Sequence, residues 1–241
     1  MSTHQVPKIK TLKFEQVSFH YENSPIIFDD VNFDFPTDKF VWVRSLHSGS
    51  GRSTLLQILA GLAPVSSGQY QINGENISEM SFEEFLPYRL AIGYSFDFGG
   101  LLHNQTLIEN LKLPLLYHKI CSHSEAVKKV THYMEALDIL KYKDMRPSNV
   151  QTSVRKIAAL IRPLLLSPQL LLLDDPSLGV EQEIVLKYLD IIQELRKQGT
   201  CQHVFISTFD EKLMGLIEHQ EVLINNSQLV AEEIGKKVVS L

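Results

Sequence analysis

Hydrophobic and polar residues alternate with a period of two along the first part of the chain. The hydrophobic positions of this pattern are Leu12, Phe14, Val17, Phe19, Val31, Phe33 and Phe35. Such alternation is typical of strands that bury one face. Residues 69–72, followed by Asn73-Gly74, predict another strand that ends in a hairpin turn. We therefore expect an antiparallel sheet in the N-terminal part of the chain.

Continuous hydrophobic runs elsewhere predict strands that are buried on both faces. The runs lie at residues 40–43, 91–96, 170–173 and 204–208. The run at 170–173 is the clearest, because four leucines are followed directly by Asp174 and Asp175. Residues 221–230 predict a closing hairpin that turns at Asn225-Asn226. Because helical patterns alternate with these strands, we expect an α/β fold with a mostly parallel sheet.

Three helices are expected from capping residues and from hydrophobic positions three or four apart. Residues 104–106 predict the start of a helix over 107–113 that Pro114 interrupts. Ser124 predicts the cap of a second helix, and a third is expected over 181–197. The hydrophobic positions of the second helix are Val127, Val130, Met134, Leu137 and Leu140. Residues 98–166 are helix-rich and lie between two core strands, so we expect an inserted helical lobe within one domain over 1–241.

The composition limits the kinds of protein that this chain can be. It has 241 residues, of which 44% are hydrophobic, enough for one substantial core. Residues 164–173 form the longest hydrophobic stretch, which is broken by polar residues and falls short of the roughly 20 residues of a membrane-spanning helix. The polar residues 1–10 do not resemble a signal peptide. We expect a cytoplasmic protein.

Charge and cysteine content narrow the choice of partners. The net charge of −5 disfavours nucleic-acid binding, which needs a basic face. Cys121 and Cys201 make no disulfide framework and fit a reducing compartment. Neither observation identifies an activity, so function has to be sought in local motifs.

A phosphate-binding loop is predicted between the run at 40–43 and a leucine-rich helix. Its residues are Leu46, His47, Ser48, Gly49, Ser50, Gly51, Arg52, Ser53 and Thr54. The glycines let backbone N–H groups point inward, and the following helix offers the positive end of its dipole to an anion. The usual pattern has glycine where this chain has Leu46 and lysine where it has Arg52. The loop therefore predicts nucleotide binding and puts hydrolysis in question.

The acidic end of the leucine run is the second chemical motif. An aspartate such as Asp174, at the end of a buried strand near a phosphate loop, can hold magnesium, usually through water. The alternative is a carboxylate that caps a nearby helix. The residues alone leave both readings open.

The order and spacing of these motifs resemble the ATP-binding subunits of ABC transporters over nearly the whole chain. The motifs that carry the resemblance are Tyr21, residues 48–56, Gly61-Leu62, Ser67-Gly68, residues 92–96, residues 106–115, and Pro168 ahead of residues 171–176. The finer likeness of residues 99–115 is to subunits of lipid-handling systems. The resemblance implies a phosphate-loop ATPase core.

The resemblance also implies ligands and partners. Tyr21 would stack on adenine, the alternative being a core or rim tyrosine. The residues implied for the phosphates are Ser48, Gly49, Ser50, Gly51, Arg52, Ser53 and Thr54. Ser53, Asp174 and Asp97 would hold Mg²⁺, although the residues favour a solvated loop aspartate at position 97. A groove near residues 97–102 would receive a membrane-spanning subunit, which would keep the chain on the inner face of the membrane as part of a homodimer or heterodimer.

Several positions depart from the family pattern. The signature that faces the partner's nucleotide falls on residues 150–154, which lack its serine and both glycines. The catalytic glutamate is replaced by Asp175, the phosphate-sensing glutamine by Asp97, and the switch histidine by Phe209. A phenyl ring can neither donate nor accept the hydrogen bonds of a histidine. Arg155 and Lys156, after the signature, are expected to be surface charges on a helix start.

These departures favour an ATP-binding subunit that is impaired in hydrolysis and has a structural or regulatory role. ATP and Mg²⁺ would then be weakly bound or lost. One alternative is a slow but genuine transport ATPase that uses Asp175 as its catalytic residue. Another is an interaction module that no longer uses nucleotide. Whether the chain is an enzyme stays open from the sequence.

Overall fold

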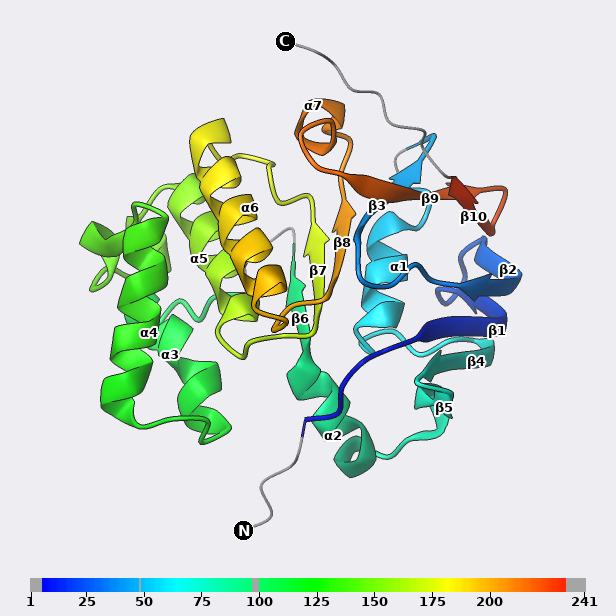
Figure 1. The fold of residues 1–241 in the computed structure, drawn as a ribbon, viewed down its shortest axis with the longest axis horizontal. Helices are drawn as coiled ribbons and strands as arrows, with labels where there is room; N and C mark the ends of the chain where they lie inside the picture. Colours follow the sequence, from blue (N-terminus) through cyan, green and yellow to red (C-terminus); the bar gives the residue numbers. More distant parts are fainter. Residues whose placement is uncertain (1–5, 48, 97–99, 233–241) are drawn as a thin grey trace. The chain divides into compact units, whose positions relative to one another are not determined.

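The computed structural model describes residues 6–47, 49–96 and 100–232. The chain forms two compact units, Met1–Arg89 with His203–Leu241, and Leu90–Gln202. Figure 1 labels the helices and strands of both. Ser48 and Asp97 of the predicted site lie outside the described residues.

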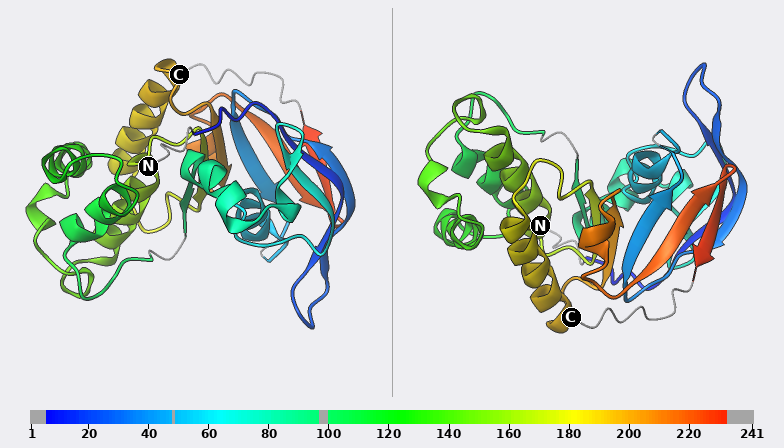
Figure 2. Two further views of the ribbon diagram at one scale, coloured as in Figure 1. Left: turned by 90° about the horizontal axis from the view of Figure 1, so that it is seen from below. Right: turned by 90° about the horizontal axis from the view of Figure 1, so that it is seen from above.

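The first unit contains the antiparallel sheet that the alternating pattern predicts. Its strand order is β2-β1-β4-β5. The strands are β1 (Leu12–His20), β2 (Ile26–Asp34), β4 (Ser67–Ile72) and β5 (Glu75–Asn76). The turn between β1 and β2, drawn in blue, projects from the end of this sheet (Figure 2). The predicted hairpin at Asn73-Gly74 is confirmed, because Ile72 pairs with Glu75.

A bulge in β1 explains how two buried residues can lie three positions apart. Phe14 and Val17 are both fully buried, which strict alternation does not permit. The pairing of β1 with β2 shifts between them, and Gln16 has a φ of +51°. The extra residue of the bulge turns Val17 back to the buried face.

The first unit also contains parallel strands. β3 (Phe40–Ser45) pairs in parallel with both β8 (His203–Ser207) and β9 (His219–Asn225), and β10 (Gln228–Glu232) runs antiparallel to β9. The closing hairpin is confirmed, but its two turn residues are Asn226 and Ser227, one position later than predicted. Both have positive φ, the geometry that a two-residue hairpin turn needs.

An aromatic cluster links these two sheets of the first unit. The Phe14 ring lies edge-on to Phe35 at 4.8 Å, and Phe35 meets Phe205 of β8 at 5.9 Å. The backbone N–H of Asp29 in β2 also donates to the carbonyl of Ser227 at 3.2 Å. The remaining elements of this unit are α1 (Arg52–Leu59), η1 (Ile77–Glu79), α7 (Glu211–Met214) and most of α2 (Phe82–Ala91).

Helix α2 was not expected from the sequence. Its start follows Ser81, whose hydroxyl accepts a hydrogen bond from the Glu84 N–H at 3.3 Å. The Glu84 carboxylate accepts one in return from the Ser81 N–H at 2.8 Å. This reciprocal pattern, serine followed three residues later by glutamate, was the signal that could have found the helix.

The described residues of the second unit include a parallel strand pair and four helices, α3 to α6. β6 (Ile92–Ser95) pairs in parallel with β7 (Leu170–Asp174), which confirms the predicted leucine strand. The helices and short 3₁₀ turns are α3 (Leu107–Tyr117), α4 (His123–Ala136), η2 (Leu140–Tyr142), η3 (Pro147–Asn149), α5 (Thr152–Leu164) and α6 (Gln182–Lys197). Helix α3 packs against α4 and α5, and α5 packs against β6 and β7. That residues 98–166 act as an inserted lobe stays a prediction.

Two details of the predicted helices were wrong. Pro114 lies inside α3 and does not interrupt it, because Leu111 and Leu115 on either side are buried on the packed face. The cap of α4 is Ser122 and not Ser124. Ser122 has Glu125 three residues later, which completes a reciprocal capping box that Ser124 cannot form.

None of the helices in the described ranges combines the length and hydrophobicity that crossing a membrane requires.

Candidate functional site

The phosphate loop lies at the carboxyl edge of the parallel strands of the first unit. β3 leads directly into the loop and then into α1, while β8 ends at Ser207. Because β3 and β8 are parallel neighbours, the residues that follow them emerge at the same edge. Open α/β sheets bind ligands at this edge. The fold therefore places the predicted loop where a nucleotide site is expected.

The conformation of the loop depends on glycine at two positions. Gly49 has a φ of +78° and Gly51 a φ of +93°. A Cβ atom on Gly51 would also lie 2.4 Å from Cγ2 of Ile27, which no side chain could tolerate without displacement. Leu46, by contrast, does not adopt a positive φ, and its side chain is exposed. The leucine thus replaces the usual glycine without forcing the backbone into the left-handed region.

The start of α1 has the features of an anion site. Its N-cap is Gly51, which has no side chain to satisfy the first N–H groups, and its first turn contains no acidic residue. Ser53 is exposed at the second helical position. Free N–H groups at a helix start and the positive end of the dipole both favour a phosphate. The residues present therefore fit the phosphate groups of a nucleotide.

Tyr21 lies beside this helix and is hydrogen-bonded to its side chains. Its hydroxyl is 3.2 Å from Thr54 Oγ1 and donates to Gln57 Oε1 at 3.3 Å. The ring packs edge-on against Phe19 at 4.9 Å, and 42% of the residue is exposed. The structure thus joins Tyr21 to the phosphate-loop helix. Stacking of this ring on adenine stays a prediction.

Arg52 and Phe209, two separate departures in the sequence, contact each other. The Arg52 guanidinium carbon lies 3.5 Å from the centroid of the Phe209 ring. This is a cation–π stack, in which the positive charge meets the negative face of the ring. Nothing in the sequence pairs these residues, since one follows β3 and the other β8. The contact is a feature of the site that sequence reasoning missed.

In the second unit, the acidic end of β7 is confirmed as a buried strand end. Asp174 is 3% exposed, and Asp175, with a φ of +42°, is partly buried. Lys156, which the sequence suggested was a surface charge, is 5% exposed. Its ammonium donates to the backbone carbonyl of Asp174 at 3.2 Å. Because α5 packs on β7, this face of the helix is turned inward, and that prediction was wrong.

The segment at the signature position forms the start of α5. Gln151 is the N-cap, and its side chain makes no capping hydrogen bond. The Arg155 guanidinium bends back over this end, donating to the carbonyls of Pro147 at 3.1 Å and Val150 at 2.9 Å. It also donates to Thr152 Oγ1 at 2.9 Å. Arg155 is therefore a structural clamp on the helix start and not a simple solvated charge.

The predicted site residues are thus grouped within each unit. The first unit brings together Tyr21, the phosphate loop and Phe209, whereas the second places Lys156 against the end of β7. The predicted magnesium ligands draw on both units and include Asp97, which lies outside the described residues. That ligand set stays a prediction.

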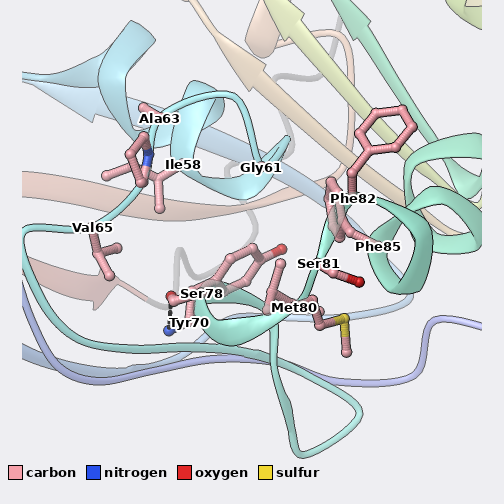
Figure 3. Close-up of a pocket in the computed structure, with 12 residues that line it drawn as sticks. Ile58, Gly61, Ala63, Val65, Tyr70, Ser78, Met80, Ser81, Phe82 and Phe85 are labelled. Carbon is pink, nitrogen blue, oxygen red and sulfur yellow. Dashed lines mark hydrogen bonds between the residues drawn. The ribbon is translucent and has the colours of Figure 1, made fainter.

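An apolar pocket of about 210 Å³ lies elsewhere in the first unit and was also missed from the sequence. Figure 3 shows Phe82 and Phe85 of α2 together with Met80 and Tyr70 among its lining residues. No charged side chain lines it, and the Tyr70 hydroxyl donates a hydrogen bond to the carbonyl of Leu59 at 3.0 Å. The polar side chains of its lining are the hydroxyl residues Tyr70, Ser78 and Ser81.

Known proteins share sequence similarity with most of this chain. A family model described as ABC transporter matches residues 28–178. The chain is 27% identical to the methionine import ATP-binding protein MetN of Bartonella henselae, over 77% of this chain and 53% of that protein. It is 28% identical to the cell division ATP-binding protein FtsE of Haemophilus influenzae, over 84% of this chain and 92% of that protein. The chain thus spans only about half the length of the MetN relative.

Solved structures show the same fold. The dimeric structure of MJ0796, a bacterial ABC transporter cassette, superposes with a TM-score of 0.84 at 21% sequence identity. The match covers 93% of this chain and 99% of that chain. At this identity the likeness confirms the α/β fold with its antiparallel N-terminal sheet, and carries no further conclusion.

Proposed function

The chain belongs to the ABC transporter family, and on this premise we propose that it is an ATP-binding subunit of a membrane transporter, impaired in hydrolysis. The observation that carries the proposal is the glycine-dependent phosphate loop with Phe209 at its edge. The loop keeps the geometry that binds phosphates. The group that would assist bond breaking has been replaced by a ring without hydrogen-bonding atoms.

Nucleotide binding is supported by the start of α1. In the proposed complex, the backbone of residues 49–54 and the Arg52 side chain hold the phosphates, and Tyr21 holds the base. By the family resemblance, Ser53 would hold Mg²⁺ together with Asp174 and Asp97, and Ser48 would bind phosphate. The metal ion, when bound, neutralises negative charge on the phosphates. The chain's own contribution is to position the nucleotide.

Impaired hydrolysis is supported by three replacements outside the loop. Phe209 cannot hydrogen-bond to phosphate or water. Asp175 is one methylene shorter than glutamate, and a misplacement of about 1 Å can cost around 100-fold in rate. At the signature position, Thr152 carries a side chain that Arg155 binds, where the family pattern has a small residue at a helix start. Together these changes favour binding without efficient turnover.

The proposed role is structural or regulatory within a larger assembly. Membership of the ABC transporter family supports association with a membrane-spanning subunit and with a second ATP-binding subunit, identical or different. In the proposed assembly the chain lies at the inner face of the membrane. The printed names of the relatives refer to methionine import and to cell division, and these roles belong to those proteins. The finer likeness to lipid-handling systems stays a prediction.

Separate measurements of binding and turnover test the proposal. Calorimetry and thermal unfolding with Mg·ATP should show binding, with a rise in Tm that grows with ligand concentration. Phosphate release should be at background and equal in the wild-type chain and an Asp175→Asn variant. A turnover that Asp175→Asn abolishes would identify a slow ATPase instead. Absence of both heat and thermal shift would identify an interaction module that does not use nucleotide.

A further inference from the structure

We propose that Phe209 is a positioning residue that holds Arg52 as the phosphate ligand of this site. The two replacements then act together, because the Phe209 ring orients the Arg52 guanidinium for contact with phosphate. This inference rests on the proposed nucleotide binding and deepens it. Phe209 then has a role of its own in binding, in addition to being the residue that stands where the family pattern has the switch histidine.

The stack has the geometry of direct face contact. A distance of 3.5 Å from the guanidinium carbon to the ring centroid is van der Waals contact. The N–H donors of a guanidinium lie in its own plane, so stacking on its face does not block their directions. Lysine, a compact point charge, would gain less from such a platform. An arginine that must present a planar fork to phosphate gains orientation from it.

The platform itself is fixed, although Phe209 is 51% exposed. The Trp42 indole N–H donates to the carbonyl of Thr208 at 2.9 Å, and the Asp210 N–H donates to Thr208 Oγ1 at 3.1 Å. The Asp210 carboxylate then caps α7 by accepting from the Leu213 N–H at 3.0 Å. Both neighbours of Phe209 are thus anchored. A large exposed aromatic ring on a rigid turn is suited to hold a functional group.

Arg52 starts from an equally fixed point. It is the first residue of α1, and the preceding Gly51 leaves no room for a Cβ atom beside Ile27. The Leu55 N–H closes the first helical turn on the Gly51 carbonyl at 2.8 Å. The Arg52 side chain therefore starts from the ordered first turn of α1 and ends in contact with the Phe209 ring. Pre-organisation of this kind lowers the entropy that binding must overcome.

A double-mutant cycle on the full chain tests this assignment with Mg·ATP as the probe and calorimetric affinity as the readout. Phe209→Leu keeps an apolar side chain but removes the ring, and should weaken binding by about 5-fold to 30-fold. Phe209→Tyr keeps the ring face and should stay within about 2-fold of wild type. In an Arg52→Met background, Phe209→Leu should have no effect, because the ring has no cation to hold.

The possible failures are distinguishable. A wild-type chain that does not bind Mg·ATP would overturn the proposed function itself. A chain that binds, but in which Phe209→Leu is neutral or its effect adds fully to that of Arg52→Met, would overturn the positioning role alone. Thermal unfolding without nucleotide controls for folding. If Phe209→Leu did not fold, Phe209→Met would remove the ring in its place.

Discussion

The indole Nε1 of Trp42 donates a buried hydrogen bond of 2.9 Å to the backbone carbonyl of Thr208. The bond joins the strand that leads into the phosphate loop to the residue that precedes Phe209. The bond adds a side-chain link between two parts of the candidate site, distant in sequence, that the parallel pairing of β3 with β8 brings together.

Replacing Trp42 with phenylalanine should destabilise the protein by about 1–3 kcal/mol. The substitution leaves a buried carbonyl without its donor and removes buried volume. Trp42 is the only tryptophan in the sequence, so urea unfolding should be followed by circular dichroism and not by fluorescence. A cost below about 0.5 kcal/mol would show that the bond does not hold the two segments together.

Gly51→Ala should destabilise the protein by about 1–3 kcal/mol more than Gly49→Ala. Both glycines have positive φ, so both variants share that backbone penalty. A Cβ at position 51 would meet Ile27, whereas nothing lies within 4 Å of a Cβ at position 49. Thermal unfolding of the two variants measures the difference. Adding Ile27→Ala to Gly51→Ala should recover part of the loss, and no recovery would contradict the collision.

Arg44→Met should cost about 2–4 kcal/mol, because it removes the arginine that pairs with the buried carboxylate of Glu221 and leaves only His219, at 3.8 Å, among the described residues. Glu221 is 3% exposed, and its Oε2 lies 2.9 Å from Arg44 Nη1. The matched control is Glu211→Gln, which removes the second and exposed partner of Arg44 at 3.3 Å. That control should change stability by less than about 1 kcal/mol. Denaturant midpoints of both variants measure the two stability changes. Equal losses in Arg44→Met and Glu211→Gln would refute the role of burial.

The two cysteines should react with thiol reagents at very different rates. Burial raises the pKa of Cys201 to about 12, with a smaller opposing effect from Arg196. Its thiolate, the reactive form, is therefore scarce at pH 8 and increases only at high pH. Cys121 is partly exposed. A Cys121→Ser variant should stay unmodified until it unfolds, and rapid modification of that native variant would contradict the burial of Cys201.

Stability should fall as the pH rises above about 10, the ordinary pKa of tyrosine. Burial raises the pKa of Tyr188 well above its usual value, and its hydroxyl donates to the carbonyl of Leu160 at 2.9 Å. In that pH range the unfolded chain loses the proton while the folded chain keeps it, so the unfolded state binds fewer protons and is favoured. Urea midpoints from pH 8 to pH 11 measure the slope. Tyr188→Phe should reduce the slope, whereas Tyr117→Phe, on an exposed side chain, should not.

Features that depend on neighbouring residues in the chain were predictable from the sequence. The strand Leu170–Asp174, the alternating N-terminal strands and the strand–loop–helix order of β3 and α1 were all identified correctly. Each of these features depends on residues only a few positions apart: the hydrophobic period, the turn residues and the spacing of the phosphate loop. The local sequence therefore contains the information that predicts them. The resemblance to the ABC transporter family followed from the order of these local motifs and was confirmed.

Other features depend on which faces of the elements meet, and the sequence could not provide them. Lys156 follows the signature position like a surface charge, yet packing of α5 on β7 turns it inward. Arg52 and Phe209 become partners only because β3 and β8 are parallel neighbours that end at one edge. By itself the sequence determined most of the elements, the loop and the family, because those are encoded locally. The tertiary structure alone decided which charged and aromatic side chains meet, because such contacts arise only when distant segments pack together.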